Sequence, residues 1–140
     1  MAARLRENGF RCRTVEISVR DKDLYSFTRQ TKISNVTNIT NEIAEKAFKL
    51  FQANYRWNKP IRSIGVRACD LVCDNYWEQE NLFTDYAMRE KQMALDNAVD
   101  DIRRRFGFHS IQRGLMLNDK LLSSVNVKED HIVHPKGFFG

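Results

Sequence analysis

The fold class is indicated by one short alternating stretch, Thr14-Val15-Glu16-Ile17-Ser18-Val19-Arg20. Valine and isoleucine occupy every second position and polar residues lie between them, which is the period of a strand with one buried face. Turn-forming residues follow at 21–23, and residues 24–33 have the pattern of a returning strand. We therefore predict that strands 11–20 and 24–33 pair as an antiparallel hairpin.

The segments that follow complete the predicted fold. Residues 41–55 have apolar side chains at helical spacing, and after Pro60 the chain alternates again, which predicts a strand over 61–72. A longer helix is predicted over 87–106; its apolar stripe consists of Leu95, Ala98, Val99, Ile102 and Phe106. The sequence thus predicts an α+β fold, in which an antiparallel sheet of three or four strands is backed by helices and followed by a C-terminal helix and tail.

Charge is distributed unevenly along the 140 residues, whose net charge is +5. Residues 1–72 carry 14 Lys or Arg against 7 Asp or Glu, whereas residues 73–106 carry 5 against 8. A basic first half suggests a polyanionic partner such as nucleic acid. Many basic proteins bind no nucleic acid, so charge alone leaves this open.

Several classes of protein are disfavoured by the sequence. No apolar run approaches the roughly 20 residues of a membrane-spanning helix, and the first residues lack the apolar core of a signal peptide, so we expect a cytoplasmic protein without a membrane partner. The odd number of cysteines, three, favours reduced thiols. Cys69 and Cys73 with the histidines match no standard zinc ligand set, and Asp21 and Asp23 fit a turn better than a metal pair.

Three stretches carry a resemblance to a known family: the hairpin of residues 13–29, the strand Ile61-Arg62-Ser63-Ile64-Gly65-Val66-Arg67, and residues 98–114. In this order they resemble the C-terminal part of Y-family DNA polymerases, of the polymerase IV and UmuC-like kind, whose closing strand reads R-x-I-G-V-R. The resemblance implies a truncated little-finger domain over residues 1–75. It further implies a linker over 76–86, and a C-terminal helix and extension over 87–140.

The family's domain organisation sets further expectations. Its little finger is a β-α-β-β-α-β unit, so the resemblance implies that the first strand and most of the first helix are missing here. An uncovered sheet edge invites pairing with another copy, and a homodimer is therefore a hypothesis. The family's catalytic carboxylates and their Mg²⁺ belong to the palm domain. We accordingly expect no catalytic residue, cofactor or metal site in this chain.

The resemblance also implies how the domain would act. The family's little finger grips the phosphates of both strands of primer-template DNA in translesion synthesis, and such contacts position the duplex without reading its bases. Gly65 of this chain would let a phosphate approach the backbone. Ser63 occupies a position where the family usually has arginine. Carried over by position, the predicted DNA contacts are Arg62, Ser63, Gly65 and Arg67 on strand 61–72, with Arg20, Thr28, Arg29 and Lys32 on the hairpin. The alternative is that these are solvated charges on an exposed sheet.

The linker carries a second signal, Gln79-Glu80-Asn81-Leu82-Phe83, which resembles the Q-L-x-L-F peptide by which bacterial polymerases attach to the sliding clamp. It implies that Gln79, Leu82 and Phe83 contact the clamp, although Glu80 stands where the family favours leucine. Leu82 and Phe83 could instead pack onto the domain's own core. The alternative function is a protein-interaction module, in which this peptide and the acidic helix matter and DNA is not contacted.

Overall fold

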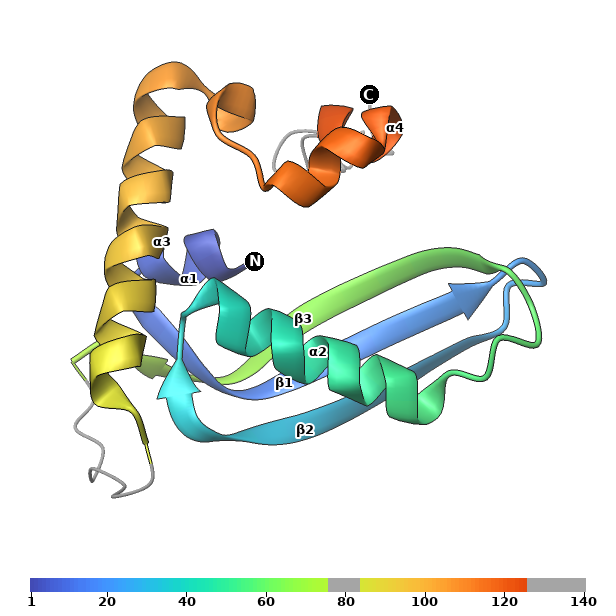
Figure 1. Cartoon of the computed structure of the whole chain (residues 1–140). Helices are drawn as coiled ribbons and strands as arrows, with labels where there is room; N and C mark the ends of the chain where they lie inside the picture. Colours follow the sequence, from blue (N-terminus) through green and yellow to red (C-terminus); the bar gives the residue numbers. More distant parts are fainter. Residues whose placement is uncertain (76–83, 126–140) are drawn as a thin grey trace, which may run out of the picture. The chain divides into compact units, whose positions relative to one another are not determined.

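The computed structural model describes residues 1–75 and 84–125, and the chain divides into two compact units, Met1–Asp96 and Asn97–Gly140 (Figure 1). The first unit contains strands β1 (Phe10–Asp21), β2 (Ser26–Thr37) and β3 (Ile61–Cys73), with helices α1 (Ala2–Glu7) and α2 (Thr40–Asn54). Helix α3 (Tyr86–Phe106) begins in the first unit and continues into the second, which also holds η1 (Phe108–Ser110), η2 (Gly114–Asn118) and α4 (Lys120–Ser124).

The strands form one antiparallel sheet in the order β2-β1-β3, so that β1 is the central strand. The register between β1 and β3 shifts once, between Arg20 and Asp21. The register between β1 and β2 is irregular between Cys12 and Thr14. The predicted hairpin is present, and the α+β fold class is confirmed with a sheet of three strands in the described residues.

The core lies between the central strand and α2. Val15, Ile17 and Val19 expose at most 1% of their surface. Helix α2 packs on β1 and β2, and its Ile43, Ala47 and Phe51 join the same buried cluster. Spacing of four residues places apolar side chains on one side of a helix, which explains why this segment folds as an amphipathic helix over the sheet.

The start of α2 is completed from a distant part of the chain. Ile39 occupies the N-cap position and offers no side-chain acceptor. The carboxylate of Asp96 on α3 accepts a hydrogen bond of 2.7 Å from the Thr40 backbone N–H. One of the four unsatisfied N–H groups at the helix start is therefore bonded by tertiary contact instead of by a local cap.

Two arginines attach the first half of α3 to the rest of the first unit. Arg6 lies 3.1 Å from Asp96, and these side chains are only 10% and 17% exposed. Arg89 pairs with Glu42 at 2.8 Å and donates to the Val36 carbonyl at 3.0 Å. These are charge-assisted hydrogen bonds, which are shorter and stronger than neutral ones.

Helix α3 buries none of its residues completely. Its predicted apolar stripe forms part of the surface, since Leu95, Ile102 and Phe106 are 59%, 36% and 75% exposed. Across residues 1–75 and 84–125, no helix combines the length and the apolar character needed to cross a bilayer.

The second unit is organised around Arg103 of α3. Its guanidinium lies 4.7 Å from the centre of the Phe108 ring and donates to the Ile111 carbonyl at 3.0 Å. The Gln112 amide donates to the Ser123 carbonyl at 2.7 Å, which connects the segment before η2 to α4. Polar contacts thus fix the turns that follow α3.

Strand β3 is covered less completely than its neighbours. Ile64 and Val66 are 55% and 42% exposed, although they pair with the buried Val19 and Ile17 of β1. Helix α2 packs on the other two strands, which leaves this part of the sheet open. The predicted pairing of an uncovered sheet edge with a second copy stays a prediction.

Shortening a buried side chain of the central strand tests this assignment of the core. We expect Ile17→Ala to lower the free energy of unfolding by about 2–5 kcal/mol, because it removes buried methyl groups and leaves a cavity. Ile64→Ala removes the same atoms from an exposed position and should cost about 1 kcal/mol or less. Urea unfolding followed by circular dichroism measures both, and equal losses would contradict the assignment of the core.

Thiol labelling tests burial at the other end of β1. All three cysteines are free; Cys12 is buried and Cys73 is exposed. Burial raises the pKa of the Cys12 thiol from 9.0 to about 11. Since the thiolate is the reactive form, we expect iodoacetamide at pH 8 to label Cys73 in the native protein and Cys12 only after unfolding. Mass spectrometry of the peptides gives the order, and early labelling of Cys12 would contradict the structure.

Candidate nucleic-acid interface

One face of the sheet carries polar side chains from all three strands. Residues paired directly across antiparallel strands share a face, so the register determines its membership. Ser18 pairs with Thr28 and Gly65, and Arg20 pairs with Ser26 and Ser63. The surface formed by these residues together with Glu16, Gln30, Lys32 and Arg67 is called the outer face below.

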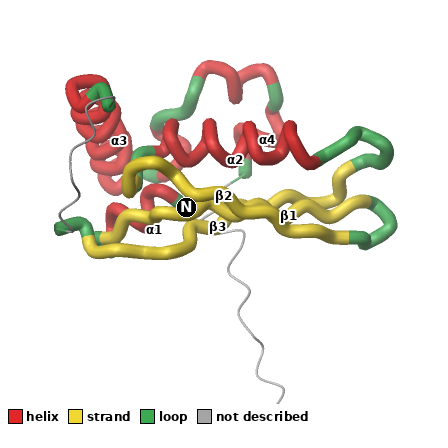
Figure 2. Tube along the Cα trace, turned by 90° about the horizontal axis from the view of Figure 1, so that it is seen from below, coloured by secondary structure: helices red, strands yellow, loops and turns green. Residues whose placement is uncertain are grey.

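The outer face lies opposite α2. Figure 2 shows α2 as a separate layer on one side of the strands. Every residue of the outer face is exposed or half-buried, whereas the alternate residues of β1 are buried beneath α2. The pleat of β1 therefore separates an apolar side that packs from a polar side that meets solvent.

The chemistry of the outer face is that of an anion-binding surface. Arg20, Lys32 and Arg67 supply three cations, and hydroxyl groups of serine and threonine lie between them. Cations and hydroxyls are the side-chain donors that contact phosphate oxygens in protein–DNA complexes. A surface with donors spread over three strands can contact several phosphates and leave the base edges untouched.

Among the residues that define the outer face, one is acidic, Glu16. Its carboxylate is 3.2 Å from the Arg67 guanidinium, whose side chain is 75% exposed. Exposed ion pairs contribute about 0–1 kcal/mol, so this pair does little to hold Arg67 in place. Arg67 can therefore exchange Glu16 for an external anion at small cost.

Gly65 allows a close contact in the middle of the outer face. A Cβ atom at this position would lie 2.6 Å from the Ser18 Oγ, which is inside van der Waals contact. With no side chain at Gly65, the Ser18 hydroxyl and the β3 backbone are both accessible from solvent. That a phosphate approaches the backbone at Gly65 stays a prediction.

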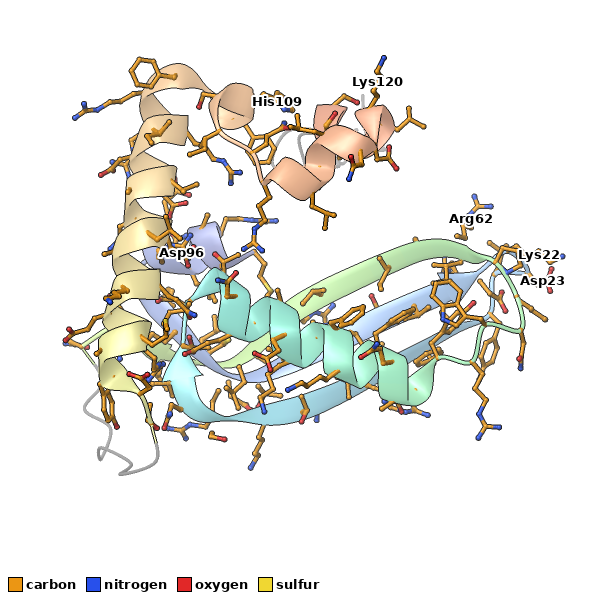
Figure 3. The ribbon with its side chains drawn as sticks, in the orientation of Figure 1. Lys22, Asp23, Arg62, Asp96, His109 and Lys120 are labelled. Atoms are coloured by element: carbon orange, nitrogen blue, oxygen red, sulfur yellow. The ribbon has the colours of Figure 1, made fainter. Side chains whose placement is uncertain are left out.

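The structure divides the predicted DNA contacts into two groups. Six of them share the outer face: Arg20, Thr28, Lys32, Ser63, Gly65 and Arg67. Arg29 pairs with Ile17 and lies on the α2 side, 5.5 Å from the centre of the Phe27 ring. Arg62 alternates with Ser63 and lies at the beginning of β3, beside the register shift (Figure 3).

Arg29 therefore does not share the face of Thr28 and Arg67, and Arg62 lies at the irregularity of β3. That these two arginines contact DNA stays a prediction. Neighbouring residues of a strand point to opposite faces, so Thr28 and Arg29 cannot both lie on the outer face. The same alternation places Ser18 on the outer face, although Ser18 was not among the predicted DNA contacts. Its place among the polar residues of strand 11–20 was the signal that could have identified it.

Other predicted sites are placed as follows. Gln79, Leu82 and Phe83 lie outside the described residues. Asp21 acts as a turn residue, because its carboxylate accepts hydrogen bonds from the Asp23 and Tyr25 N–H groups at 2.9 and 3.0 Å. Among the residues that the structure describes, no group of three or more His, Cys, Asp or Glu side chains is arranged to hold a metal ion.

Comparison with known proteins identifies the family of this chain. The impB/mucB/samB family C-terminal domain matches residues 1–82. The chain belongs to this family. The predicted resemblance to the C-terminal part of Y-family DNA polymerases is thereby confirmed, and its matched range includes the whole sheet with the outer face.

Two curated relatives extend the match beyond the impB/mucB/samB C-terminal domain. A protein named DNA polymerase IV from Acetivibrio thermocellus is 41% identical over 122 residues, which cover 87% of this chain and 31% of the relative. A protein named DNA polymerase IV 2 from Bacillus subtilis is 38% identical over 117 residues, which cover 81% of this chain and 27% of the relative. The chain spans less than a third of the length of either relative.

Proposed function

We propose that this domain binds duplex DNA through the outer face, without sequence preference, as the little finger of a lesion-bypass DNA polymerase. The observation that supports the proposal most directly is the register, which gathers Arg20, Lys32 and Arg67 with four hydroxyl groups on one solvent-exposed face. The family assignment supports it independently, since relatives that match most of this chain are named DNA polymerase IV.

Contacts of this kind suit a polymerase that copies damaged templates. Phosphates repeat at the same spacing whatever the bases are, so a surface that contacts only phosphates holds any sequence equally well. A lesion alters a base and leaves the backbone in place. The outer face would thus keep primer and template in position while the rest of the enzyme, with Mg²⁺ in its palm domain, transfers the nucleotide.

A titration of blunt duplex DNA tests the proposal. We expect Arg67→Gln to weaken binding about fivefold and to lower the slope of log K against log salt concentration by about 0.9, because one phosphate contact is lost. Glu16→Gln should strengthen binding about two- to fivefold, because it removes a negative charge from the outer face. Lys49→Gln on the exposed side of α2 changes the net charge equally and serves as the matched control.

The outcome separates the two functions suggested by the sequence. Fluorescence anisotropy on two duplexes of unrelated sequence should give equal affinities, with Arg67→Gln and Glu16→Gln acting in opposite directions. If both variants bind as the wild type does, or if Lys49→Gln weakens binding as much as Arg67→Gln, the outer face does not bind DNA. The protein-interaction module would then be the better assignment.

We further propose that the peptide Gln79–Phe83 attaches the protein to a bacterial sliding clamp. The proposal rests on the sequence, in which two large apolar residues follow a glutamine at the spacing of the clamp-binding peptide. Such side chains would fill an apolar pocket, and each buried one typically contributes about 1.5–3 kcal/mol.

Surface plasmon resonance with a purified bacterial clamp tests this second proposal. We expect the double change Leu82→Ala and Phe83→Ala to weaken binding at least tenfold, since about 3 kcal/mol or more of apolar burial is lost. Asn81→Ala lies within the same peptide and should change little. Glu80→Leu restores the residue that the family favours and should tighten binding. Unchanged affinity in the double variant would refute the assignment.

A further inference from the structure

Four aromatic side chains cluster on the α2 side of the sheet, at the end where the β1–β2 hairpin turns. Tyr55, which follows α2, stacks on Phe51 with ring centres 5.3 Å apart and on Phe27 of β2 at 6.4 Å. Trp57 meets Phe51 and Tyr55 at 5.7 and 5.4 Å, with interplanar angles of 83° and 80°. This group, Phe27, Phe51, Tyr55 and Trp57, is called the aromatic tip below.

Trp57 is the exposed member of the aromatic tip. It contacts Phe51 and Tyr55 in edge-to-face geometry and yet leaves 75% of its surface exposed. An aromatic pair in this geometry is stabilised by about 0.5–1.5 kcal/mol, so the two contacts orient the indole without covering it. A large aromatic ring held in place and open to solvent is a platform on which another planar group can stack.

Hydrogen bonds and an ion pair hold the loop that carries Trp57 in place. The Tyr55 hydroxyl donates to the Lys59 carbonyl, and Lys59 Nζ lies 2.8 Å from the Asp23 carboxylate. The backbone N–H of Lys22 donates to the Pro60 carbonyl at 3.1 Å. The hairpin turn and the loop after α2 therefore form one structure, and Trp57 is held before any ligand binds.

Positive charge surrounds the aromatic tip. Residues 21–29 and 55–62 contain five Lys or Arg and two Asp. Both of these acids, Asp21 and Asp23, face Lys59 at 3.9 and 2.8 Å. In the described part of the chain, Lys22, Arg56 and Arg62 form no ion pair with any acidic residue. Figure 3 shows Lys22 and Arg62 at the same end of the sheet.

We propose that the aromatic tip is a second nucleic-acid site, which binds an unpaired nucleotide by stacking its base on Trp57. Surfaces that bind single strands combine aromatic side chains with cations that follow the backbone, and this combination is present here. Lys22, Arg56 and Arg62 would contact the phosphates on either side of the stacked base. The proposal does not depend on duplex binding by the outer face, because Trp57 lies on the opposite side of the sheet.

An internal paired base of a duplex cannot serve as the ligand, since both of its faces are already stacked. A single strand that extends past the end of a duplex has bases with open faces, and all four bases present a π-surface. The site would therefore take single-stranded nucleic acid with little preference for sequence. It would add affinity for a duplex with an overhang compared with a blunt duplex.

Tryptophan fluorescence tests the site directly. The chain has two tryptophans, so Trp77→Phe leaves Trp57 as the reporter. We expect a twelve-nucleotide oligothymidine to quench Trp57, and an abasic strand of the same length and charge to quench it far less. In the otherwise unchanged chain, Trp57→Ala should weaken oligothymidine binding at least about fivefold, as expected for one lost stacking contact, while Trp57→Phe retains most of it.

Controls separate this proposal from the previous one. Phe48→Ala removes an aromatic residue of α2 that is 59% exposed and lies outside the aromatic tip, and it should leave oligothymidine binding unchanged. Trp57→Ala should leave blunt-duplex affinity unchanged, whereas Arg67→Gln should lower it. If Trp57→Ala binds oligothymidine as the wild type does, or if the abasic strand quenches equally, the stacking site does not exist. That result would leave the duplex measurement on the outer face unaffected.

Discussion

The pleat of the central strand is the constraint on which the rest of this structure depends. Successive residues of β1 point to opposite faces, and burial of Val15, Ile17 and Val19 under α2 determines which face is which. A shift of one residue in register would bury Glu16 and Ser18 and expose the valines. The apolar core and the polar outer face are therefore two consequences of one register, and neither can change without the other.

The same alternation sorts the basic residues of the domain. Arg20, Lys32 and Arg67 fall on the outer face, whereas Arg29 falls on the side of α2 and contacts the aromatic tip. A basic composition alone would suggest one cationic surface. The structure has two separate regions with different chemistry: cations with hydroxyls on the outer face, and cations with an aromatic cluster that exposes Trp57 at one end.

Polar contacts attach the first half of helix α3 to the sheet domain. The Arg6–Asp96 pair is 10% and 17% exposed, and Asp96 also bonds the first N–H of α2. Breaking a buried pair leaves an unpaired charge and is costly, whereas the pair itself often adds little stability compared with apolar packing. The carboxylate of Asp96 therefore holds the middle of α3 against both Arg6 and the start of α2.

Local sequence pattern determined the elements of this protein. The two-residue period over 11–20 and 61–72 and the helical spacing over 41–55 are properties of short segments, so the three strands and both long helices were predicted within a few residues of their observed ends. The family resemblance rests on the same contiguous segments and was identified equally well. Six of the eight predicted DNA contacts share one face, because alternation within each strand was visible in the sequence.

Only the tertiary structure determined which residues from distant segments lie next to each other. The placement of Arg29 beside Phe27, and the assembly of the aromatic tip from β2, α2 and the loop before β3, depend on how distant segments pack. The capping of α2 by Asp96 joins residues 56 positions apart, so the sequence near either residue does not predict it. The apolar stripe of α3 follows from its sequence, but its exposure does not, because a spacing pattern shows which residues share a helix face and not whether another element covers that face.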